Sequence, residues 1–583
     1  MQIVANGPGR RPSRAVNRIA MVMMIFGCLY TVIGIRLIVL ASQEPPQQTY
    51  SSIPPSVARP DIVDRSGRRL AMDISAVSVF AEPRKIVDLD EAVEGLLKVF
   101  PNLEMLDLRK RLDSSAGFAW IKRIATPEQQ SQLMALGIPG VGLRDETRRI
   151  YPNGSTAAHL LGTVNVDNVG IAGIEKWIDT QGLNDLKQAG LRFDRSDLAP
   201  VVLSIDLRVQ HAVKAELDKA VKKFGALAGA GLVLDVTNGE IIALVSLPDF
   251  DPNAPADALK PDRINRINVG TYEMGSTFKA MTTAFALESG LYNLNSVVDA
   301  SQPLRFGRMA IRDYHGKGRP LKVPEAFVYS SNIAMGRMAL GVGKQKHQAF
   351  LKSLGQFDRL TTELPESAQP IVPSRWSEIT TATAAFGHGI AVTPLQAAVG
   401  VAALVNGGDL VRPTLIKGAA LEDRILRRAV VSRQTSEAIR FLMRLNTEVG
   451  SAKKAEVAEY FVGGKTGTSE KVINGRYSSE RVLTTFMGIA PADKPRYLFL
   501  TLLDEPKGLP ETLGFRTSGW NAVPVTGEIM RRSLPILLAP YRNPPANPFP
   551  NIVATGAWGT ERFMPSSGLS ESAISRAKLA TRQ

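Results

Sequence analysis

A long apolar run near the start of the sequence is followed by a short polar stretch with no helical or alternating hydrophobic spacing. Residues 19–41 (IAMVMMIFGCLYTVIGIRLIVLA) are apolar except for Arg36, and residues 1–18 contain four arginines and no acid. Such a run is long enough for a bilayer core, which needs about 20 residues. Arginines that precede the run place the N-terminus in the cytoplasm. The pattern predicts a cytoplasmic basic segment at 1–18, a transmembrane helix at 19–41 and a proline-containing linker at 42–58.

A cleaved signal peptide is the alternative interpretation of this run. The apolar core of a signal peptide is about 7–15 residues long and is followed by a cleavage site made of small residues. The run in this sequence is longer, and no convincing cleavage site follows it. An uncleaved anchor is therefore favoured.

Beyond residue 58 the hydrophobic pattern becomes that of a mixed α/β protein. Apolar and polar residues alternate over 71–82, which is typical of a strand. Apolar residues recur at helical spacing over 91–100, 103–112 and 127–136. These segments predict a first folded domain, at 59–200, that contains both helices and strands.

A second pattern begins near residue 201. Helical spacing covers 208–224, and 231–246 contains two apolar runs separated by Thr-Asn-Gly, a strong hairpin signal. Helices that alternate with β runs predict a sheet covered by helices, and we assign this domain to 201–540. The chain then becomes rich in Pro and Asn and later in Ser and Ala, which predicts a mobile tail at 541–583.

Composition and charge narrow the possible functions. The chain has one cysteine, which excludes an intrachain disulfide and a multi-cysteine metal cluster. The five histidines lack metal-ligand spacing and no phosphate-binding glycine loop is present, so neither a metal nor a cofactor is expected. Of the net charge of +15, the basic segment carries +4, Arg36 +1 and the tail +3. The remaining +7 is mild for the length of chain between them, so a nucleic-acid surface is not indicated.

Ser276 and Lys279 form the first candidate for chemistry. They lie in Met-Gly-Ser-Thr-Phe-Lys, directly before the apolar segment 280–287, which is typical of a helix N-terminus. On a helix, residues three apart share one face, so the lysine can lie beside the serine hydroxyl. An amine kept partly neutral by burial can take the proton of a serine nucleophile. By itself this spacing is weak, and a capped helix with a solvated lysine is its ordinary explanation.

Two further motifs make the pattern specific. Ser330-Ser-Asn332 lies 54 residues after Ser276, and Lys465-Thr-Gly-Thr468 follows later, after a β-prone run. Alone, the first would be read as a helix cap and the second as a turn. A Lys-Thr-Gly strand presents an ammonium, a hydroxyl and a glycine that permits close approach along one cleft wall. All three motifs in this order, at spacings suited to one domain, point to a single serine-dependent site.

With these three motifs the chain resembles a class B penicillin-binding protein, most closely the septal, FtsI-type peptidoglycan D,D-transpeptidases. The resemblance runs from Arg10 to about Pro540. The supporting stretches are residues 59–67, 151–154, 170–175, 387–396 and 488–491. Two positions depart from the family: Met274 stands where proline is frequent, and Arg59-Pro60 stands where Arg-Gly is frequent. Neither departure touches the reacting groups.

The resemblance implies a fold. It is the serine penicillin-recognising transpeptidase fold of the α/β (α+β) class, an antiparallel sheet flanked by helices. It would occupy 201–540 and stand on a non-catalytic pedestal (dimerisation-type) domain at 59–200, with one transmembrane helix before them.

The resemblance also implies a reaction and a role for each motif residue. The serine would attack the carbonyl between the two D-alanines of a peptidoglycan stem peptide, and an amine of a neighbouring stem would then capture the acyl-enzyme. The implied catalytic residues are Ser276 (nucleophile), Lys279 (general base), Ser330 (proton relay), Asn332 (contact to the donor amide) and Lys465 (positive potential). The implied substrate-binding residues are Thr466, Gly467 and Thr468, with the N–H groups of Ser276 and Thr468 as the oxyanion hole.

Partners and location follow from the same resemblance. It implies lipid-linked or nascent stem peptides as substrates, β-lactams as inhibitors, and divisome membrane proteins, including a polytopic glycosyltransferase, as partners. The protein would be a single-pass protein of the bacterial inner membrane, with a cytoplasmic N-terminus and a periplasmic catalytic domain.

Three alternatives remain open at this point. An elongation-specific class B transpeptidase tends to carry Asp where this chain has Asn332, which favours the division type. A β-lactamase-like hydrolase shares the motifs but is soluble and much shorter. An inactive divisome scaffold is disfavoured by the intact motif residues.

Overall fold

A computed structural model describes residues 14–42, 58–183, 198–473, 475–540, 548–549 and 552. The predicted basic segment, linker and tail therefore lie almost entirely outside the described residues. The chain divides into two compact units, residues 1–55 with 76–146, and residues 56–75 with 147–583. The strand β2 (Arg69–Ala81) contributes residues to both units.

The first helix, α1 (Arg14–Ser42), contains the apolar run of the sequence. Its side chains are described over 21–36 and are mostly exposed, and the free thiol of Cys28 is among them. In the part of the chain that the structure describes, no helix is both long enough and apolar enough to cross a membrane.

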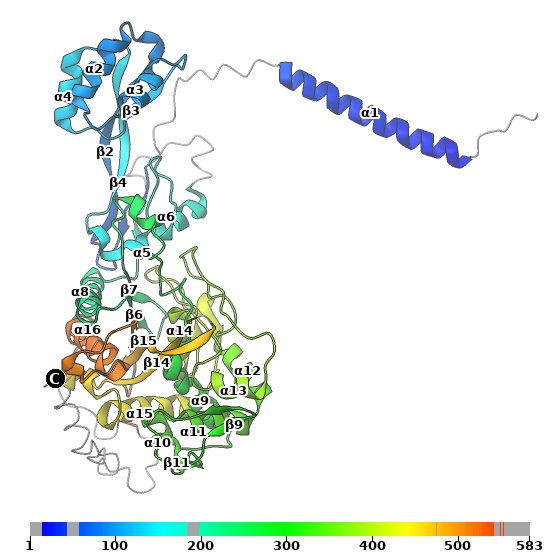
Figure 1. Cartoon of the computed structure of the whole chain (residues 1–583), viewed down its shortest axis with the longest axis vertical. Helices are drawn as coiled ribbons and strands as arrows, with labels where there is room; N and C mark the ends of the chain where they lie inside the picture. Colours follow the sequence, from blue (N-terminus) through cyan, green and yellow to red (C-terminus); the bar gives the residue numbers. More distant parts are fainter. Residues whose placement is uncertain are drawn as a thin grey trace, which may run out of the picture. The chain divides into compact units, whose positions relative to one another are not determined.

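In the first unit, three short helices pack on a small sheet (Figure 1). These helices are α2 (Leu89–Val99), α3 (Met105–Leu112) and α4 (Pro127–Leu136). They confirm the three predicted helices, and β2 confirms the predicted strand. The sheet contains the distal half of β2, β3 (Ala119–Lys122) and β4 (Val141–Ile150).

The second unit begins with a buried ionic network that joins segments distant in sequence. The guanidinium of Arg59 binds Glu175 at 2.9 Å and Asp179 at 2.6 Å, and that of Arg149 binds Glu175 at 2.7 Å and Asp73 at 3.0 Å. The side chains of both arginines are fully buried. Hydrogen bonds from the two arginines to the Pro60, Asn168 and Glu175 carbonyls complete the network. Ionic contacts therefore hold this region together in addition to apolar packing.

The rest of this unit is built around a five-stranded antiparallel sheet. Its strands run in the order β14-β15-β16-β6-β7. Their bounds are β14 (Gly463–Ile473), β15 (Arg476–Ala490), β16 (Tyr497–Asp504), β6 (Ala228–Asp235) and β7 (Ile241–Leu247). The predicted hairpin at 231–246 is confirmed as the β6–β7 pair. β14 is an edge strand, so one of its sides is free to line a site.

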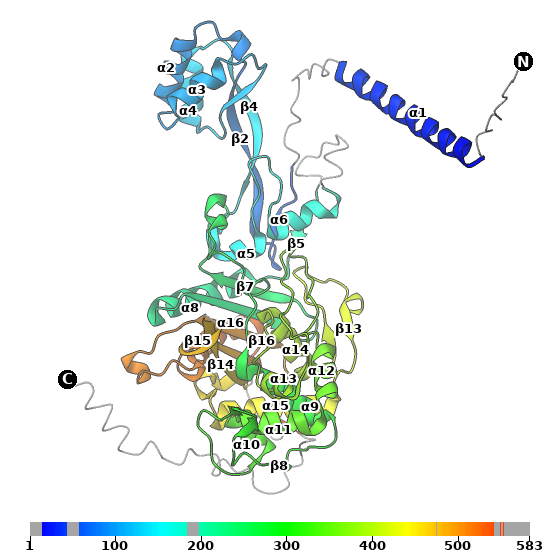
Figure 2. The ribbon, with the colours of Figure 1, turned by 45° about the vertical axis from the view of Figure 1, so that its right-hand side comes forward.

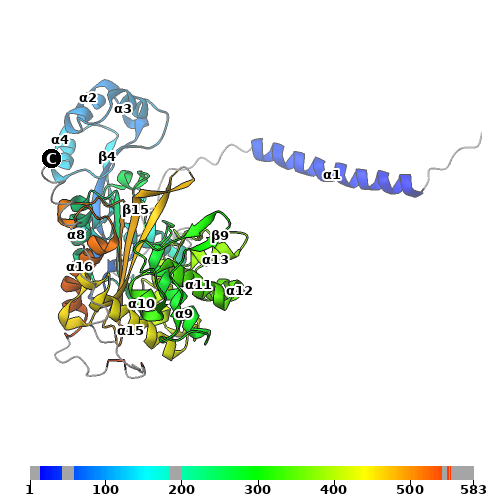
Figure 3. The same cartoon turned by 60° about the horizontal axis from the view of Figure 1, so that its bottom comes forward.

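Helices cover both faces of this sheet (Figure 3). On one face lie α8 (Leu207–Phe224), which confirms the predicted helix at 208–224, and α16 (Ala522–Leu537). The other face carries a helical layer that contains most of the buried core. Its helices are α9 (Lys279–Glu288), α10 (Val323–Val328), α11 (Asn332–Val342), α12 (Lys344–Ser353), α13 (Glu378–Ala384), α14 (Pro394–Val405) and α15 (Arg433–Val449). The predicted fold, an antiparallel sheet flanked by helices, is confirmed.

Short elements complete the unit. The remaining helices and strands are β1 (Ile62–Val63), α5 (Ala158–Leu161), α6 (Gly173–Ile178), β5 (Val201–Val202), β8 (Val297–Val298), β9 (Leu304–Phe306), β10 (Met309–Ile311), β11 (Leu321–Lys322), β12 (Leu410–Val411) and β13 (Ile425–Arg427). β1 pairs with β5 in parallel and with β2 in antiparallel fashion, which ties the start of this unit to the segment that leads into α8.

Candidate active site

Ser276 lies on a tight turn that leads into α9. The turn is a 3₁₀ helix, η6 (Gly275–Phe278), and α9 begins at Lys279. A single α-helix starting at the serine was expected, so the structure refines this element. In 3₁₀ geometry, side chains three residues apart eclipse one another, which keeps Ser276 and Lys279 on one side. Gly275 has φ +56°, a backbone conformation that a glycine adopts without strain.

Ser330 brings the two motif lysines together. It lies between α10 and α11, and its neighbour Ser331 caps α11 by accepting the N–H of Ala334. The amines of Lys279 and Lys465 each donate to the hydroxyl oxygen of Ser330 at 3.0 Å. The Lys279 amine also donates to the Ser330 carbonyl. With φ +57°, Ser330 holds a left-handed conformation that is unusual for a residue with a side chain.

β14 carries the third motif and lies beside β15 in the sheet (Figure 2). It also packs against the turn η6 that holds Ser276. A Cβ on Gly467 would approach the Met274 carbonyl oxygen to 2.7 Å, and the carbonyl of Thr468 lies 3.0 Å from a Cβ placed on Gly275. Only a strand without a side chain at 467 can pack this closely. The predicted close approach of Gly467 is therefore seen, although the strand begins at Gly463, after the run that was expected to be β.

Burial dominates the electrostatics of the two lysines. Lys279 is fully buried, and burial, with the nearby charge of Lys465, holds its pKa well below the usual lysine value. Burial lowers the pKa of Lys465 to about 7. Asp313 acts in the opposite direction on Lys279, and it accepts hydrogen bonds from the Ser331 hydroxyl and the Ile333 N–H. The lowered pKa makes the neutral amine of Lys279 available beside Ser330 at a pH well below the usual lysine value.

The remaining motif residues are held by partners that no motif predicts. The side-chain amide of Asn332 donates to the Arg312 carbonyl at 3.0 Å, which leaves its oxygen for other donors. The Thr466 hydroxyl lies 2.8 Å from the Ser451 hydroxyl, and the Thr468 hydroxyl accepts the Ser518 N–H at 3.1 Å. Asp313, Ser451 and Ser518 carry no recognisable spacing in the sequence, and their role depends on the folded chain.

A second group of residues, to which no sequence pattern pointed, borders the turn η6 that holds Ser276. Gly387 accepts the Gly275 N–H through its carbonyl at 3.3 Å, and a Cβ on Gly387 would lie 2.8 Å from the Gly275 nitrogen. Next to it, the N–H of Gly389 donates to Glu273 at 2.8 Å, and Tyr477 donates to the same carboxylate at 3.0 Å. The position of Glu273, three residues before Ser276, was the one signal that could have drawn attention to it.

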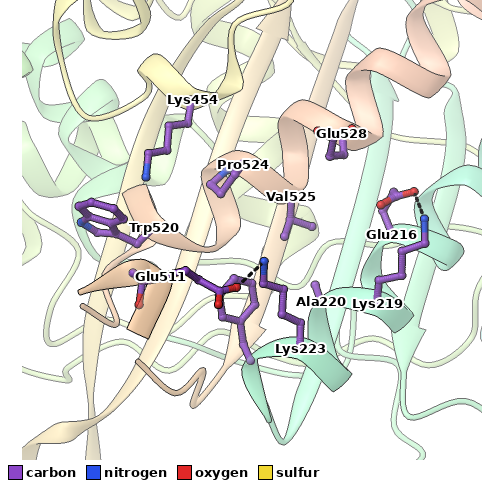
Figure 4. Close-up of a pocket in the computed structure, with 12 residues that line it drawn as sticks. Glu216, Lys219, Ala220, Lys223, Lys454, Glu511, Trp520, Pro524, Val525 and Glu528 are labelled. Atoms are coloured by element: carbon purple, nitrogen blue, oxygen red, sulfur yellow. Dashed lines mark hydrogen bonds and ion pairs between the residues drawn. The ribbon is translucent and has the colours of Figure 1, made fainter. Parts of the chain in front are cut away.

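A separate pocket of about 410 Å³ lies on the other face of the sheet, beside α8 and α16 (Figure 4). It contains none of the motif residues. Four of its charged side chains form ion pairs: Lys219 with Glu216 at 2.9 Å and Lys223 with Glu511 at 2.8 Å. Lys454 lies 3.5 Å from the ring centre of Trp520. This pocket is therefore separate from the hydrogen-bonded cluster of Lys279, Ser330 and Lys465.

Comparison with known families covers both units. The penicillin binding protein transpeptidase domain matches residues 229–531, and the penicillin-binding protein dimerisation domain matches residues 54–181. The matched transpeptidase segment includes all three motifs.

Individual relatives extend over most of the chain. The probable peptidoglycan D,D-transpeptidase FtsI of Caulobacter vibrioides is 39% identical over 492 residues, which cover 82% of this chain and 81% of the relative. The peptidoglycan D,D-transpeptidase FtsI of Escherichia coli is 30% identical over 500 residues, 82% and 83% of the two chains. Among solved structures, Penicillin Binding Protein 2X from Streptococcus thermophilus aligns with a TM-score of 0.63 and 21% identity over 82% of this chain and 79% of that one, which is a likeness of fold.

Proposed function

Because the chain belongs to the class B penicillin-binding proteins and is a peptidoglycan D,D-transpeptidase of the FtsI-like type, we propose that it cross-links stem peptides through an acyl-enzyme on Ser276. In this proposed function, residues 59–200 form the non-catalytic pedestal domain and residues 201–540 form the catalytic domain. Transpeptidase domains of this family act on peptidoglycan and bind β-lactams.

In the first half-reaction, the neutral amine of Lys279 takes the proton of the Ser276 hydroxyl as its oxygen attacks the D-Ala-D-Ala carbonyl. The N–H groups of Ser276 and Thr468 stabilise the oxyanion, and loss of one such donor typically costs about 10²–10³ in rate. Ser330 relays the proton from Lys279 to the leaving amine of the terminal D-alanine. Asn332 binds the donor amide, and Thr466 and Thr468 bind its terminal carboxylate beside the charge of Lys465. Gly467 permits the close approach of the donor to β14.

The observation that carries this proposal is the shared hydrogen bonding of Ser330. Its hydroxyl accepts from Lys279 and from Lys465, both at 3.0 Å, although the three residues are far apart in sequence. The placement of two buried lysine amines on one hydroxyl has no benefit for packing, because burial of even one charged amine is unfavourable. It does supply one neutral amine and one cation at the position where acyl transfer needs both.

Labelling with a fluorescent penicillin tests the nucleophile. We expect membranes with the wild-type chain to be labelled and membranes with Ser276→Ala to be unlabelled at equal protein level. Lys279→Ala is expected to abolish acylation while the fold survives. Persistent labelling of the Ser276→Ala chain would refute the assignment.

The rate at which the label is lost separates a transpeptidase from a β-lactamase-like hydrolase. A transpeptidase keeps the penicilloyl adduct, whereas a hydrolase releases it and turns over. We therefore expect the adduct to persist after excess penicillin is removed.

We also propose that the protein acts at the division septum. Asn332 in the second motif and the FtsI names of the relatives support this over an elongation role. Divisome membrane proteins, including a polytopic glycosyltransferase, are the partners proposed for this role. Depletion of the protein from its bacterium is expected to give filaments. Rounded cells would indicate elongation, and normal septal cross-linking with Ser276→Ala would indicate an inactive scaffold.

We propose further that residues 19–41 anchor the chain in the inner membrane, with the catalytic domain in the periplasm. The apolar run of the sequence and the exposed apolar side chains of α1, such as Met23 (71% exposed) and Tyr30 (68% exposed), support this proposal. A chain that begins at residue 58 is expected in the soluble fraction, acylated by penicillin as fast as the full chain. Recovery of the full chain in the soluble fraction would argue against the anchor.

A further inference from the structure

The cleft contains a carboxylate that the proposed acylation does not use. Glu273 lies three residues before the nucleophile and is only partly exposed. One of its carboxylate oxygens, Oε1, accepts from the Gly389 N–H at 2.8 Å and from the Tyr477 hydroxyl at 3.0 Å. The other oxygen, Oε2, is buried and has no hydrogen-bond partner. An ionised carboxylate with a buried oxygen that lacks a donor carries an unfavourable free energy. A cationic donor bound to that oxygen would remove this cost.

The position of this carboxylate is fixed by the segments that also hold the nucleophile turn. The Glu273 carbonyl accepts the Ser469 hydroxyl at 2.6 Å, which ties the residue to β14 directly after Thr468. The Gly387–Gly389 segment contacts Gly275 with one end and the Glu273 carboxylate with the other. A ligand group bound to Glu273 would therefore lie beside an acyl group on Ser276.

Two side chains close the space around the carboxylate. The ring of Tyr477, which is 50% exposed, lies edge-on against the ring of His388, with their centres 5.6 Å apart. The Nδ1 atom of His388 is buried without a partner. Burial, with the nearby charge of Lys279, lowers the pKa of His388 to about 4, so the imidazole is neutral near pH 7. Among the described residues, the surroundings of Glu273 thus contain ring edges and no competing cation within hydrogen-bond reach.

The charge of the cleft shows what this site would bind. Lys465 makes the floor of the cleft positive, which suits the terminal carboxylate of a donor but repels an ammonium group. A cationic second substrate needs a negative group near the acyl carbon. Asp313 is already engaged by Ser331 and Ile333, whereas Glu273 keeps an oxygen free.

We propose that Glu273, bordered by His388 and Tyr477, is the binding subsite for the primary ammonium group of the acceptor stem peptide, and that it removes one proton from that group. This inference rests on the proposed acyl-enzyme function. The neutral acceptor nitrogen then attacks the ester carbonyl, the C–N bond forms and the bond to Ser276 Oγ breaks. The second amine proton passes through Lys279 to Ser276 Oγ, and Glu273 returns its proton to solvent. Burial raises the pKa of Glu273, which makes it a better proton acceptor than an exposed carboxylate.

The partition of the acyl-enzyme between amine and water tests the subsite. The full-length chain is supplied with a thioester analogue of an acyl-D-Ala-D-Ala donor and with D-alanine as acceptor, and the products are separated chromatographically. Glu273→Gln is expected to lower the ratio of transfer to hydrolysis at least about tenfold, because a charge-assisted contact to the acceptor is lost. Transfer to D-lactate, which has a hydroxyl in place of the ammonium, is expected to be unchanged by the same substitution.

Glu470→Gln is the matched control. Glu470 is an exposed carboxylate in β14, directly after Ser469, whose hydroxyl donates to the Glu273 carbonyl. It is expected to leave the ratio within about twofold of wild type, since exposed charges are screened. Equal loss in both variants, or an unchanged ratio in Glu273→Gln, overturns the inference.

Penicillin acylation separates this inference from the proposed function. If the wild-type chain is not acylated at Ser276, the proposed function fails; if acylation is normal and Glu273→Gln transfers like wild type, only the subsite fails. If Glu273→Gln distorts the turn η6 and the chain is not acylated by penicillin, Tyr477→Phe provides the second test of the subsite. Without the competing phenol, the apparent KM for D-alanine is expected to fall about threefold. An unchanged KM contradicts the subsite.

Discussion

At Ser330 the backbone is held in the left-handed region, a conformation that costs about 1–3 kcal/mol for such a residue and persists where the surroundings impose it. The conformation turns the carbonyl toward the Lys279 amine and the hydroxyl toward both lysines. Two ammonium groups on one buried hydroxyl repel each other, so their protons leave as those of a coupled pair. The geometry of a single residue thereby brings together two lysines whose pKa values burial lowers.

This coupling predicts how acylation depends on pH. Lys279 loses its proton first, so the second-order rate with a carboxylate-bearing penicillin is expected to fall as pH rises through about 7, where Lys465 becomes neutral. Lys465→Met is expected to be slower at pH 6 and to lack this alkaline limb. Stopped-flow measurements between pH 5.5 and 8.5 test the prediction, and a rate independent of pH in both chains would contradict it.

The same shift has a consequence for stability. Between pH 7 and the unfolded-state value of 10.5, the unfolded chain keeps a proton on Lys465 that the folded chain has released. The free energy of unfolding is therefore expected to rise with pH over this window. This rise should be smaller in Lys465→Met than in wild type when urea unfolding is measured at several pH values.

At this scale the sequence carried a great deal of information. Ser276, Lys279, Ser330 and Lys465 could be nominated from motif spacing, and the structure brings the two lysines onto Ser330. Asp313, Ser451 and Ser518 could not be nominated, because their contacts arise only when segments distant in sequence meet in the fold. Asp313 reaches the start of α11, and Ser451 and Ser518 reach β14. Glu273 could have been noticed by position, but its unpaired oxygen is a property of the folded cleft.

Among the elements, the turn η6 depends on a neighbour that has no side chain. Gly387 has φ +77°, and a Cβ there would overlap the Gly275 carbonyl and lie 2.8 Å from its nitrogen. Gly387→Ala is expected to slow acylation about 10²-fold, since small displacements of a nucleophile have effects of this size. The measurement is the acylation rate with a fluorescent penicillin.

Gly290→Ala is the control for this change. Gly290 has φ +72° with nothing within 4 Å of its Cβ position, so it carries the backbone strain without the contact. Its acylation rate is expected to stay within about twofold of wild type, because the strain acts on stability and not on the site. Equal slowing of both variants would show that strain alone is responsible.

Hydrophobic periodicity predicted several of the larger elements and failed at short ones. The helices α2, α3, α4 and α8 and the β6–β7 hairpin have clear spacing over many residues. The 3₁₀ turn at Ser276 spans four residues, too few for a period to show. The β-prone residues before β14 do not form a strand, because the chain turns there and Phe461 is left-handed.

On the scale of the whole molecule, the arginine network holds together segments that the sheet does not reach. Arg149 pairs with Asp73 and Glu175 with its side chain fully buried. Arg149→Met is expected to destabilise the fold by about 3–5 kcal/mol, because it leaves two buried carboxylates short of a cation. Denaturant unfolding of the purified chain measures this loss.

An exposed ion pair provides the comparison. Arg109 pairs with Asp90 at 2.5 Å, but both side chains are largely in solvent. Arg109→Met is expected to cost at most about 1 kcal/mol. Similar losses in the two variants would mean that burial of the network does not matter.

The lone cysteine has a practical consequence for experiments on this protein. Cys28 lies in α1, and the rest of the chain contains no thiol. Cys28→Ser would give a background in which a single engineered cysteine reacts alone with a maleimide dye or spin label. A label in the β14–β15 hairpin could then report the arrival of an acceptor in real time, with no competing signal from the rest of the molecule.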